Sequence, residues 1–72
     1  MIEKEIEKLC KEIGNLAGEN PDHVAIDQTY EGFRSTIEVH NKILYFSDFH
    51  STIKESLISL KQKVVDKEQY KG

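Results

Sequence analysis

The feature that most constrains the fold of this chain is a hydrophobic period that changes twice within 72 residues. Near the N-terminus, apolar residues recur at alternating intervals of four and three, which places them on one face of an amphipathic helix. Gly14 and Gly18 weaken that helix and Pro21 cannot continue it, so we expect a helix over about 2–16. Its apolar face is formed by Ile2, Ile6, Leu9, Ile13 and Leu16.

From His23 the period becomes two, which is typical of half-buried strands. We expect strands over about 23–30, 33–40 and 43–47, joined by turns at Glu31 with Gly32 and at Asn41 with Lys42. These turns put the large apolar residues on one face of the sheet. The predicted pairs are Tyr30 with Phe33, Ile26 with Ile37, Val24 with Val39, Val39 with Leu44, and Ile37 with Phe46.

After Ser47 the helical period returns, and Thr52 and Glu55 have the spacing of a capping box, so a second helix is expected over about 50–67. Residues 1–72 should therefore form one α+β domain of order α-β-β-β-α, a three-stranded antiparallel meander with two helices packed on one face. The inward positions of the second helix are Phe49, Ile53, Leu57, Leu60 and Val64, with Ile58 and Val65 widening the apolar stripe.

The other face of the predicted sheet is open to solvent. Tyr45 and Ile43 beside His40 would form a small amphipathic patch there, either as an ordinary solvated sheet face or as a binding surface. The same patch could pair two copies in a weak symmetric homodimer. The open face is predicted to carry His23, Ala25, Asp27, Thr29, Arg34, Thr36, Glu38, His40, Ile43, Tyr45 and Ser47.

Charge is distributed unevenly along the chain, whose net charge is −3. Residues 1–32 hold eight acids and three lysines, whereas residues 33–72 hold seven bases and five acids. No basic residue occurs between Lys11 and Arg34. If the register is right, Glu19, Asp22, Asp27 and Glu31 lie along one side of the molecule and would attract a partner protein with a basic surface. Ordinary solubilising residues are the alternative reading.

Motifs for catalysis or for a cofactor are lacking, so we predict that the chain is not an enzyme and binds no cofactor. The predicted register sets His23 opposite His40, but a zinc site needs more ligands than this pair, so no metal site is expected. Cys10 is expected to be a small, partly buried apolar residue and not a reactive thiol. The glycines match neither a phosphate-binding loop nor a dinucleotide fingerprint.

Membrane insertion is not expected, because the chain has no run of eighteen apolar residues and no signal-peptide segment. We therefore expect a soluble, cytoplasmic protein. At this length roughly 60% of the unfolded surface can be buried, so a deep substrate pocket is not expected either.

Three resemblances bear on function. The order α-β-β-β-α resembles the double-stranded RNA-binding domain, but where that family has a basic cluster this chain reads HSTIKES, with Lys54 as its one lysine or arginine. Residues Phe33 to Lys71 are similar to the second half of ribosome hibernation-promoting factors, in which two strands lead through a polar turn into a lysine-rich helix. A small acidic chain of this architecture also resembles phage-encoded inhibitors such as anti-CRISPR proteins, which implies a protein partner.

Two functions follow from these observations. The first is a non-enzymatic protein-binding module, an inhibitor from a phage or mobile element that occupies a basic surface of a host protein, such as one that holds nucleic acid. Direct nucleic-acid binding is then not expected. Its binding residues would be Glu19, Asp22, Asp27 and Glu31, with Arg34, His40 and Tyr45 on the open face. The alternative is an RNA- or ribosome-associated protein that uses Arg34, Lys42, Lys54, Lys61, Lys63 and Lys67.

Overall fold

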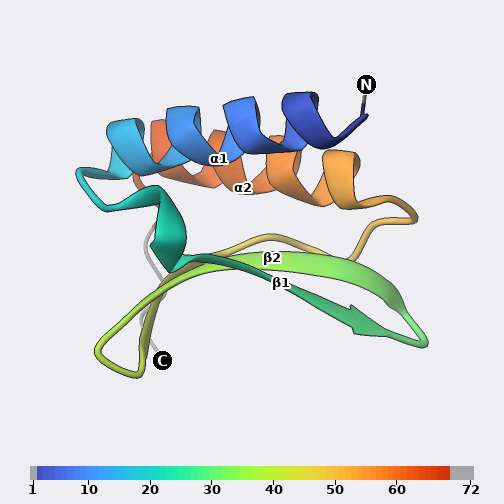
Figure 1. The fold of residues 1–72 in the computed structure, drawn as a ribbon. Coiled ribbons are helices and arrows are strands. Elements are labelled where there is room, and N and C mark those ends of the chain that lie inside the picture. The colour runs from blue at the N-terminus through green and yellow to red at the C-terminus, as the bar shows by residue number, and fades with distance from the viewer. Residues whose placement is uncertain (1, 69–72) are drawn as a thin grey trace.

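The computed structural model describes residues 2–68 and confirms the predicted order α-β-β-β-α. The three strands form one antiparallel sheet in the order β1-β2-β3. Both helices lie on the same side of this sheet, next to one another (Figure 1). The elements are α1 (Ile2–Ala17), a short 3-10 turn η1 (Pro21–His23), β1 (Val24–Thr29), β2 (Gly32–Val39), β3 (Lys42–Phe46) and α2 (Ile53–Val65).

The helix ends follow the signals in the sequence. After α1, Gly18 adopts a left-handed φ of +72°, and the N–H of Glu19 donates to the carbonyl of Gly14 at 2.8 Å. At the start of α2, the Thr52 hydroxyl accepts the N–H of Glu55 at 3.1 Å, as the capping-box spacing predicted. α2 nevertheless begins later than expected, because the chain remains extended as far as His50 in order to pair with β2.

Both predicted turns are wrong in position. The first turn is Tyr30 with Glu31, so β1 and β2 pair two residues out of the predicted register, with Val24 opposite Ile37. Because the shift is even, the residues that remain in the two strands keep their predicted faces. Tyr30, predicted to face Phe33 on the core side, instead lies in the turn and is 98% exposed. The second turn is His40 with Asn41, at φ values of 51° and 64°. A two-residue hairpin turn with positive φ at both positions needs residues that tolerate the left-handed conformation, and Asn and His adopt it more readily than most residues.

A β-bulge reverses the faces of β3. Glu38 pairs with Ile43 but Ile37 pairs with Tyr45, so Leu44 is the extra residue. Beyond the bulge, side chains point to the face opposite the one predicted. Tyr45 is 7% exposed and lies in the core, so its predicted place on the open face is wrong. Phe46 takes that place, opposite Thr36.

The core lies between the sheet and the two helices. Ile13 of α1 and Ile37 of β2 are fully buried within it. Ile58 and Val65 are about half exposed, so the predicted widening of the α2 stripe is wrong. Phe49 is also not part of the helical stripe, because it precedes α2. The remaining core residues are Tyr45, Leu57, Leu60 and Val64.

Three buried serines fasten α2 to the sheet. The hydroxyl of Ser35 donates to the carbonyl of Ser56 at 2.7 Å, and the N–H of Ser35 donates to the hydroxyl of Ser47 at 2.9 Å. All three side chains are fully buried, so Ser47 is also not on the open face as predicted. Period two places Ser35 inward, between Phe33 and Ile37, but the pattern alone does not reveal its buried polar contacts.

Candidate protein-binding surface

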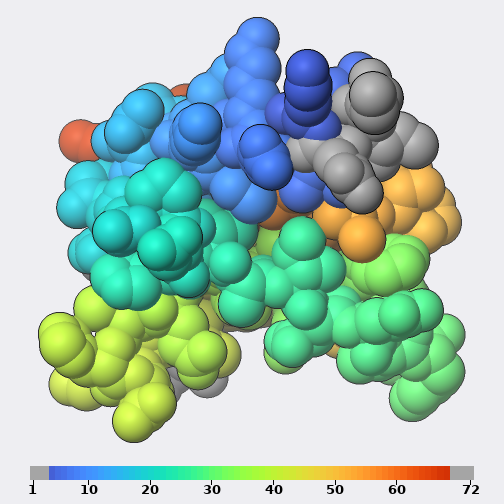
Figure 2. Space-filling view, viewed as in Figure 1, coloured from blue at the N-terminus to red at the C-terminus, as the bar shows by residue number. Residues whose placement is uncertain are grey.

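The outer edge of β1 is a free edge of the sheet. Within residues 2–68, β1 has β2 as its one strand neighbour, and its other side faces solvent. Ala25 and the run from Asp27 to Glu31 are exposed, and the side chain of Tyr30 at the hairpin tip is 98% exposed. Figure 2 shows this edge as a teal-to-green band that crosses the molecule below α1, with the two hairpins projecting beneath it.

Three of the four predicted acidic binding residues follow this edge. Asp22 lies in η1 just before β1, Asp27 lies in the middle of the strand, and Glu31 lies in the turn after it. All three are exposed. Glu19 lies apart, in the loop after α1, where its carboxylate is 3.5 Å from Nδ1 of His23. The edge of β1 therefore presents a carboxylate at its start, middle and end.

Arg34 forms an ion-pair contact with one of these acids, Asp27. Its Nη2 lies 3.9 Å from Oδ2 of Asp27, on the strand opposite, which is too long for a hydrogen bond. The guanidinium lies over the rings of Phe46 and Phe49, at 5.9 and 5.1 Å from their centroids. Its Nε is buried without an acceptor among residues 2–68. The two rings hold Arg34 on the open face, where it only partly offsets the charge of Asp27.

The rest of the predicted open-face site is not assembled. His40 is exposed in the turn between β2 and β3, and Tyr45 is in the core. The proposed homodimer patch of Ile43 and Tyr45 therefore lacks its aromatic residue, because the bulge turned it inward. Phe46 and Phe49 are the aromatic residues beside Arg34 instead, and sequence reasoning missed both.

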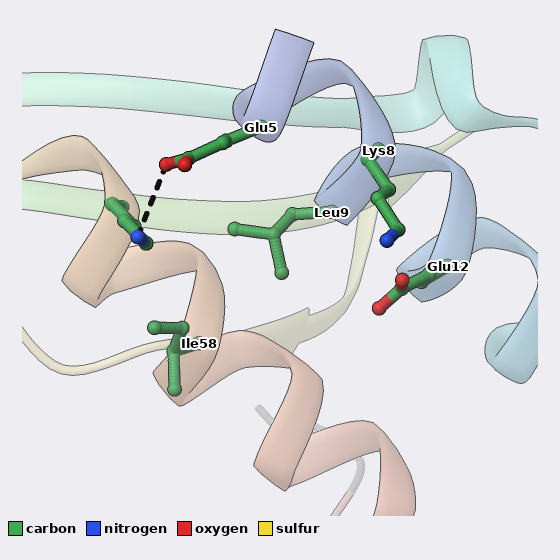
Figure 3. Close-up of a pocket in the computed structure, with 6 residues that line it drawn as sticks. Glu5, Lys8, Leu9, Glu12 and Ile58 are labelled. Carbon is green, nitrogen blue, oxygen red and sulfur yellow. Dashed lines mark hydrogen bonds and ion pairs between the residues drawn. The ribbon is translucent and has the colours of Figure 1, made fainter. Parts of the chain in front are cut away.

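The lysines of α2 are engaged in ion pairs with acids. Lys54 contacts Glu5 at 3.0 Å and Lys61 contacts Glu12 at 2.8 Å, both across the groove between the two helices. The earlier acid of α1 contacts the earlier lysine of α2 and the later acid contacts the later lysine, so the two helices run parallel. Figure 3 shows Glu5, Leu9 and Glu12 of α1 facing Ile58 of α2 along this shallow groove.

Two of the contacts made by these lysines shift the pKa of one partner. The hydrogen bond and charge of Lys61 hold the pKa of Glu12 below its ordinary value. Lys63 contacts Glu68 at 3.2 Å, and this hydrogen bond and charge raise the pKa of Lys63. Lys42 begins β3 and Lys67 follows α2, at separate places in the fold. The lysines required for an RNA surface therefore do not converge on one unpaired face.

The three histidines lie at separate places. His23 ends η1 and is not opposite His40, because the true register differs from the predicted one. His50 exchanges backbone hydrogen bonds with Phe33 at 2.7 and 2.9 Å, and its Nε2 is buried without a partner among residues 2–68. Across that part of the chain, no three His, Cys, Asp or Glu side chains are grouped so that they could hold a metal ion.

Cys10 is a free, half-buried thiol on α1. Burial raises the pKa of this thiol, and the negative charge of Glu7 adds to the effect. A raised pKa lowers the fraction of nucleophilic thiolate at neutral pH, which fits the predicted role as a small apolar residue.

Comparisons with protein families, with curated proteins and with solved structures found no match for this chain. Within residues 2–68, neither helix has the length and apolar composition needed to cross a membrane. The function proposed below is therefore inferred from the surface of the protein.

Proposed function

We propose that this protein is a non-enzymatic protein-binding module that docks the acidic edge of β1 on a basic surface of a partner protein. The observation that carries the proposal is the placement of Asp22, Asp27 and Glu31, all exposed, along a strand edge with which no other strand of residues 2–68 pairs. Binding residues on this surface are these three acids, with Glu19 at its margin. Such a module would act as an inhibitor of the phage or mobile-element type, similar in style to anti-CRISPR proteins.

Electrostatics supports a basic partner. A row of like charges attracts a surface of opposite sign and speeds encounter, and at physiological ionic strength its field extends about 8 Å beyond the protein. A protein groove that holds nucleic acid has the required positive charge. Carboxylates spaced along one edge could occupy such a groove in place of phosphates, which would block the partner without any catalysis.

The alternative, an RNA- or ribosome-associated protein, receives less support. Lys54, Lys61 and Lys63 each already contact a carboxylate, so contact with phosphates would compete with those ion pairs. The carboxylates left beside them would also repel RNA.

Charge reversal tests the proposal. A variant with Asp22→Lys, Asp27→Lys and Glu31→Lys is compared with the wild type for capture of partners from a native lysate, identified by mass spectrometry, and for thermal midpoint. We expect the wild type to capture basic, nucleic-acid-binding proteins and the variant to lose them with little change in midpoint, because all three side chains are exposed.

A matched control distinguishes the effect of the β1 edge from the effect of changing the net charge of the protein. The variant Glu7→Lys, Glu38→Lys, Asp48→Lys reverses three exposed acids away from the β1 edge and changes the net charge equally. It should retain most of the capture. Equal capture by the β1 variant and the wild type would refute the acidic docking surface.

A further inference from the structure

The backbone of β1 turns unpaired hydrogen-bonding groups toward solvent. On β2, Phe33 exchanges both of its backbone hydrogen bonds with His50, and the carbonyl of Ser35 accepts the N–H of Ser47 at 2.8 Å. These contacts lie on the side of β2 away from β1. In an antiparallel strand pair, a β1 residue opposite a β2 residue whose N–H and C=O point away from β1 also points its own N–H and C=O away from β2. Gln28 is opposite Phe33 and Ile26 is opposite Ser35, so both present these groups at the free edge.

The two edges of the sheet differ in their readiness to accept another strand. The β3 edge is interrupted by the bulge at Leu44 and begins with Lys42, both of which discourage strand pairing. The β1 edge pairs with β2 over Val24–Thr29 without any register shift, so it is straight. Between Val24 and Thr29 it carries a single charged side chain, that of Asp27.

We propose that the β1 edge receives an extended, lysine- or arginine-bearing segment of the partner protein as a fourth strand. This inference rests on the proposed function and states how the partner is bound. The N–H and C=O groups of Ile26 and Gln28 would form the hydrogen bonds to the added strand, as in other cases of peptide binding by strand addition.

The side chains of the edge specify a basic segment. A residue of the added strand opposite Asp27 would lie beside its carboxylate, and cross-strand neighbours of opposite charge are favourable. Asp22 lies just before β1 and Glu31 lies in the turn just after it, so the two acids flank Asp27 at the ends of the edge. The segment that fits best therefore has a basic residue near its middle and others toward its ends.

The same charges disfavour a second copy as the occupant. Two β1 edges paired about a twofold axis would bring Asp22, Asp27 and Glu31 of both copies onto one seam. Like charges across a strand pair are destabilising, and among residues 2–68 the ion pair found for these three acids is the long contact of Asp27 with Arg34.

Backbone blocking tests the inference. Proline at Gln28 removes an outward N–H from an edge strand, and the preceding Asp27 already has the extended conformation that proline favours. The matched control is Gln28→Ala, which also removes the exposed side chain but keeps the N–H. The probe is a short synthetic peptide of alternating lysine and valine, titrated into each full-length variant and followed by NMR amide exchange.

Strand addition predicts that the peptide slows exchange of the Ile26 and Gln28 amides in the wild type. It also predicts that Gln28→Pro weakens peptide affinity by about tenfold relative to Gln28→Ala, since a hydrogen bond is lost and its acceptor is left unpaired. A glutamate-valine peptide should not bind.

The remaining outcomes separate the two proposals. If Gln28→Pro and Gln28→Ala bind the lysine peptide equally, the acids act through side chains alone, which overturns strand addition and leaves the acidic surface intact. If the Asp22→Lys, Asp27→Lys, Glu31→Lys variant binds the lysine peptide as well as the wild type does, the acidic surface itself is refuted. Absence of peptide binding, or a concentration-dependent dimer that protects the same amides, overturns the basic segment as the occupant.

Discussion

Replacement of Gly32 by alanine should severely destabilise the fold, because this residue begins β2 in a conformation that other residues rarely adopt. Its φ is +123°, outside even the left-handed helical region. A Cβ built at Gly32 would also overlap the carbonyl oxygen of His50. Alanine therefore meets both backbone strain and a backbone clash at the point where the β1–β2 hairpin meets the connection to α2.

The size of the effect can be estimated from these two contributions. Backbone strain of this kind costs about 1–3 kcal/mol. Relief of the clash requires His50 to move away from Phe33, which breaks two hydrogen bonds worth about 0.5–1.5 kcal/mol each. The expected loss is about 2–6 kcal/mol, against a total stability of roughly 4–11 kcal/mol for a chain of this length.

Gly18→Ala is the matched control, because it carries the strain without the clash. Gly18 has a φ of +72°, and no atom lies within 4 Å of a Cβ built there. Its expected loss is about 1–2 kcal/mol. Urea unfolding followed by far-UV circular dichroism measures both variants. Equal losses for Gly18→Ala and Gly32→Ala would refute the reasoning, because the contact with His50 would then contribute nothing.

Four further outcomes are expected. Ser35→Ala should lower the free energy of unfolding in urea by about 1–3 kcal/mol, since it leaves buried partners unpaired. Lys61 lowers the pKa of Glu12 in the folded state, so the ionised carboxylate stabilises the fold above the unfolded pKa of Glu12, and this stabilisation is lost as pH falls through the folded pKa. Glu12→Gln should therefore lower the thermal midpoint at pH 7. Below both the folded and the unfolded pKa, its midpoint should match that of the wild type. Cys10 should react with a thiol reagent more slowly in the folded protein than in urea, and equal rates would contradict its burial. Calorimetry should show no zinc binding tighter than roughly micromolar, whereas tight stoichiometric binding abolished by His40→Ala would contradict this.

The parts of the fold that follow from local patterns could be predicted from the sequence. The period of α1 and the capping box of Thr52 with Glu55 each reflect interactions within a few residues, and both are present in the structure. The faces of β1 and β2 were also predicted correctly, although the turn was misplaced. An even register error leaves the inward and outward sets unchanged, so hydrophobic alternation alone cannot detect it.

The features that could not be predicted depend on contacts between distant parts of the chain. The run Ile43 to Phe46 contains four large apolar residues, so alternation does not indicate which of them point inward. The bulge at Leu44 decides this, in a strand that also packs against α2. The pairing of Phe33 with His50 likewise joins segments whose relation depends on the whole fold.

The charged residues include one feature that the sequence predicts and one that it does not. The absence of bases between Lys11 and Arg34 is visible in the sequence, and strand geometry then places Asp27 and Glu31 along one side. That Lys54 and Lys61 would be paired across the helix groove was not visible, because it requires the relative placement of α1 and α2.

The bulge in β3 links the core to the proposed binding edge. By turning Tyr45 inward it fills the space between the sheet and the helices, and it removes the aromatic residue of the predicted dimer patch. The same irregularity makes β3 a poor template for an added strand, whereas β1 keeps a straight ladder and outward groups at Ile26 and Gln28. A strand edge left open usually carries a risk of self-association, and here the carboxylates of Asp22, Asp27 and Glu31 oppose pairing with another copy. The β1 edge therefore disfavours pairing with a second copy but keeps backbone N–H and C=O groups available, which suits a partner segment of opposite charge.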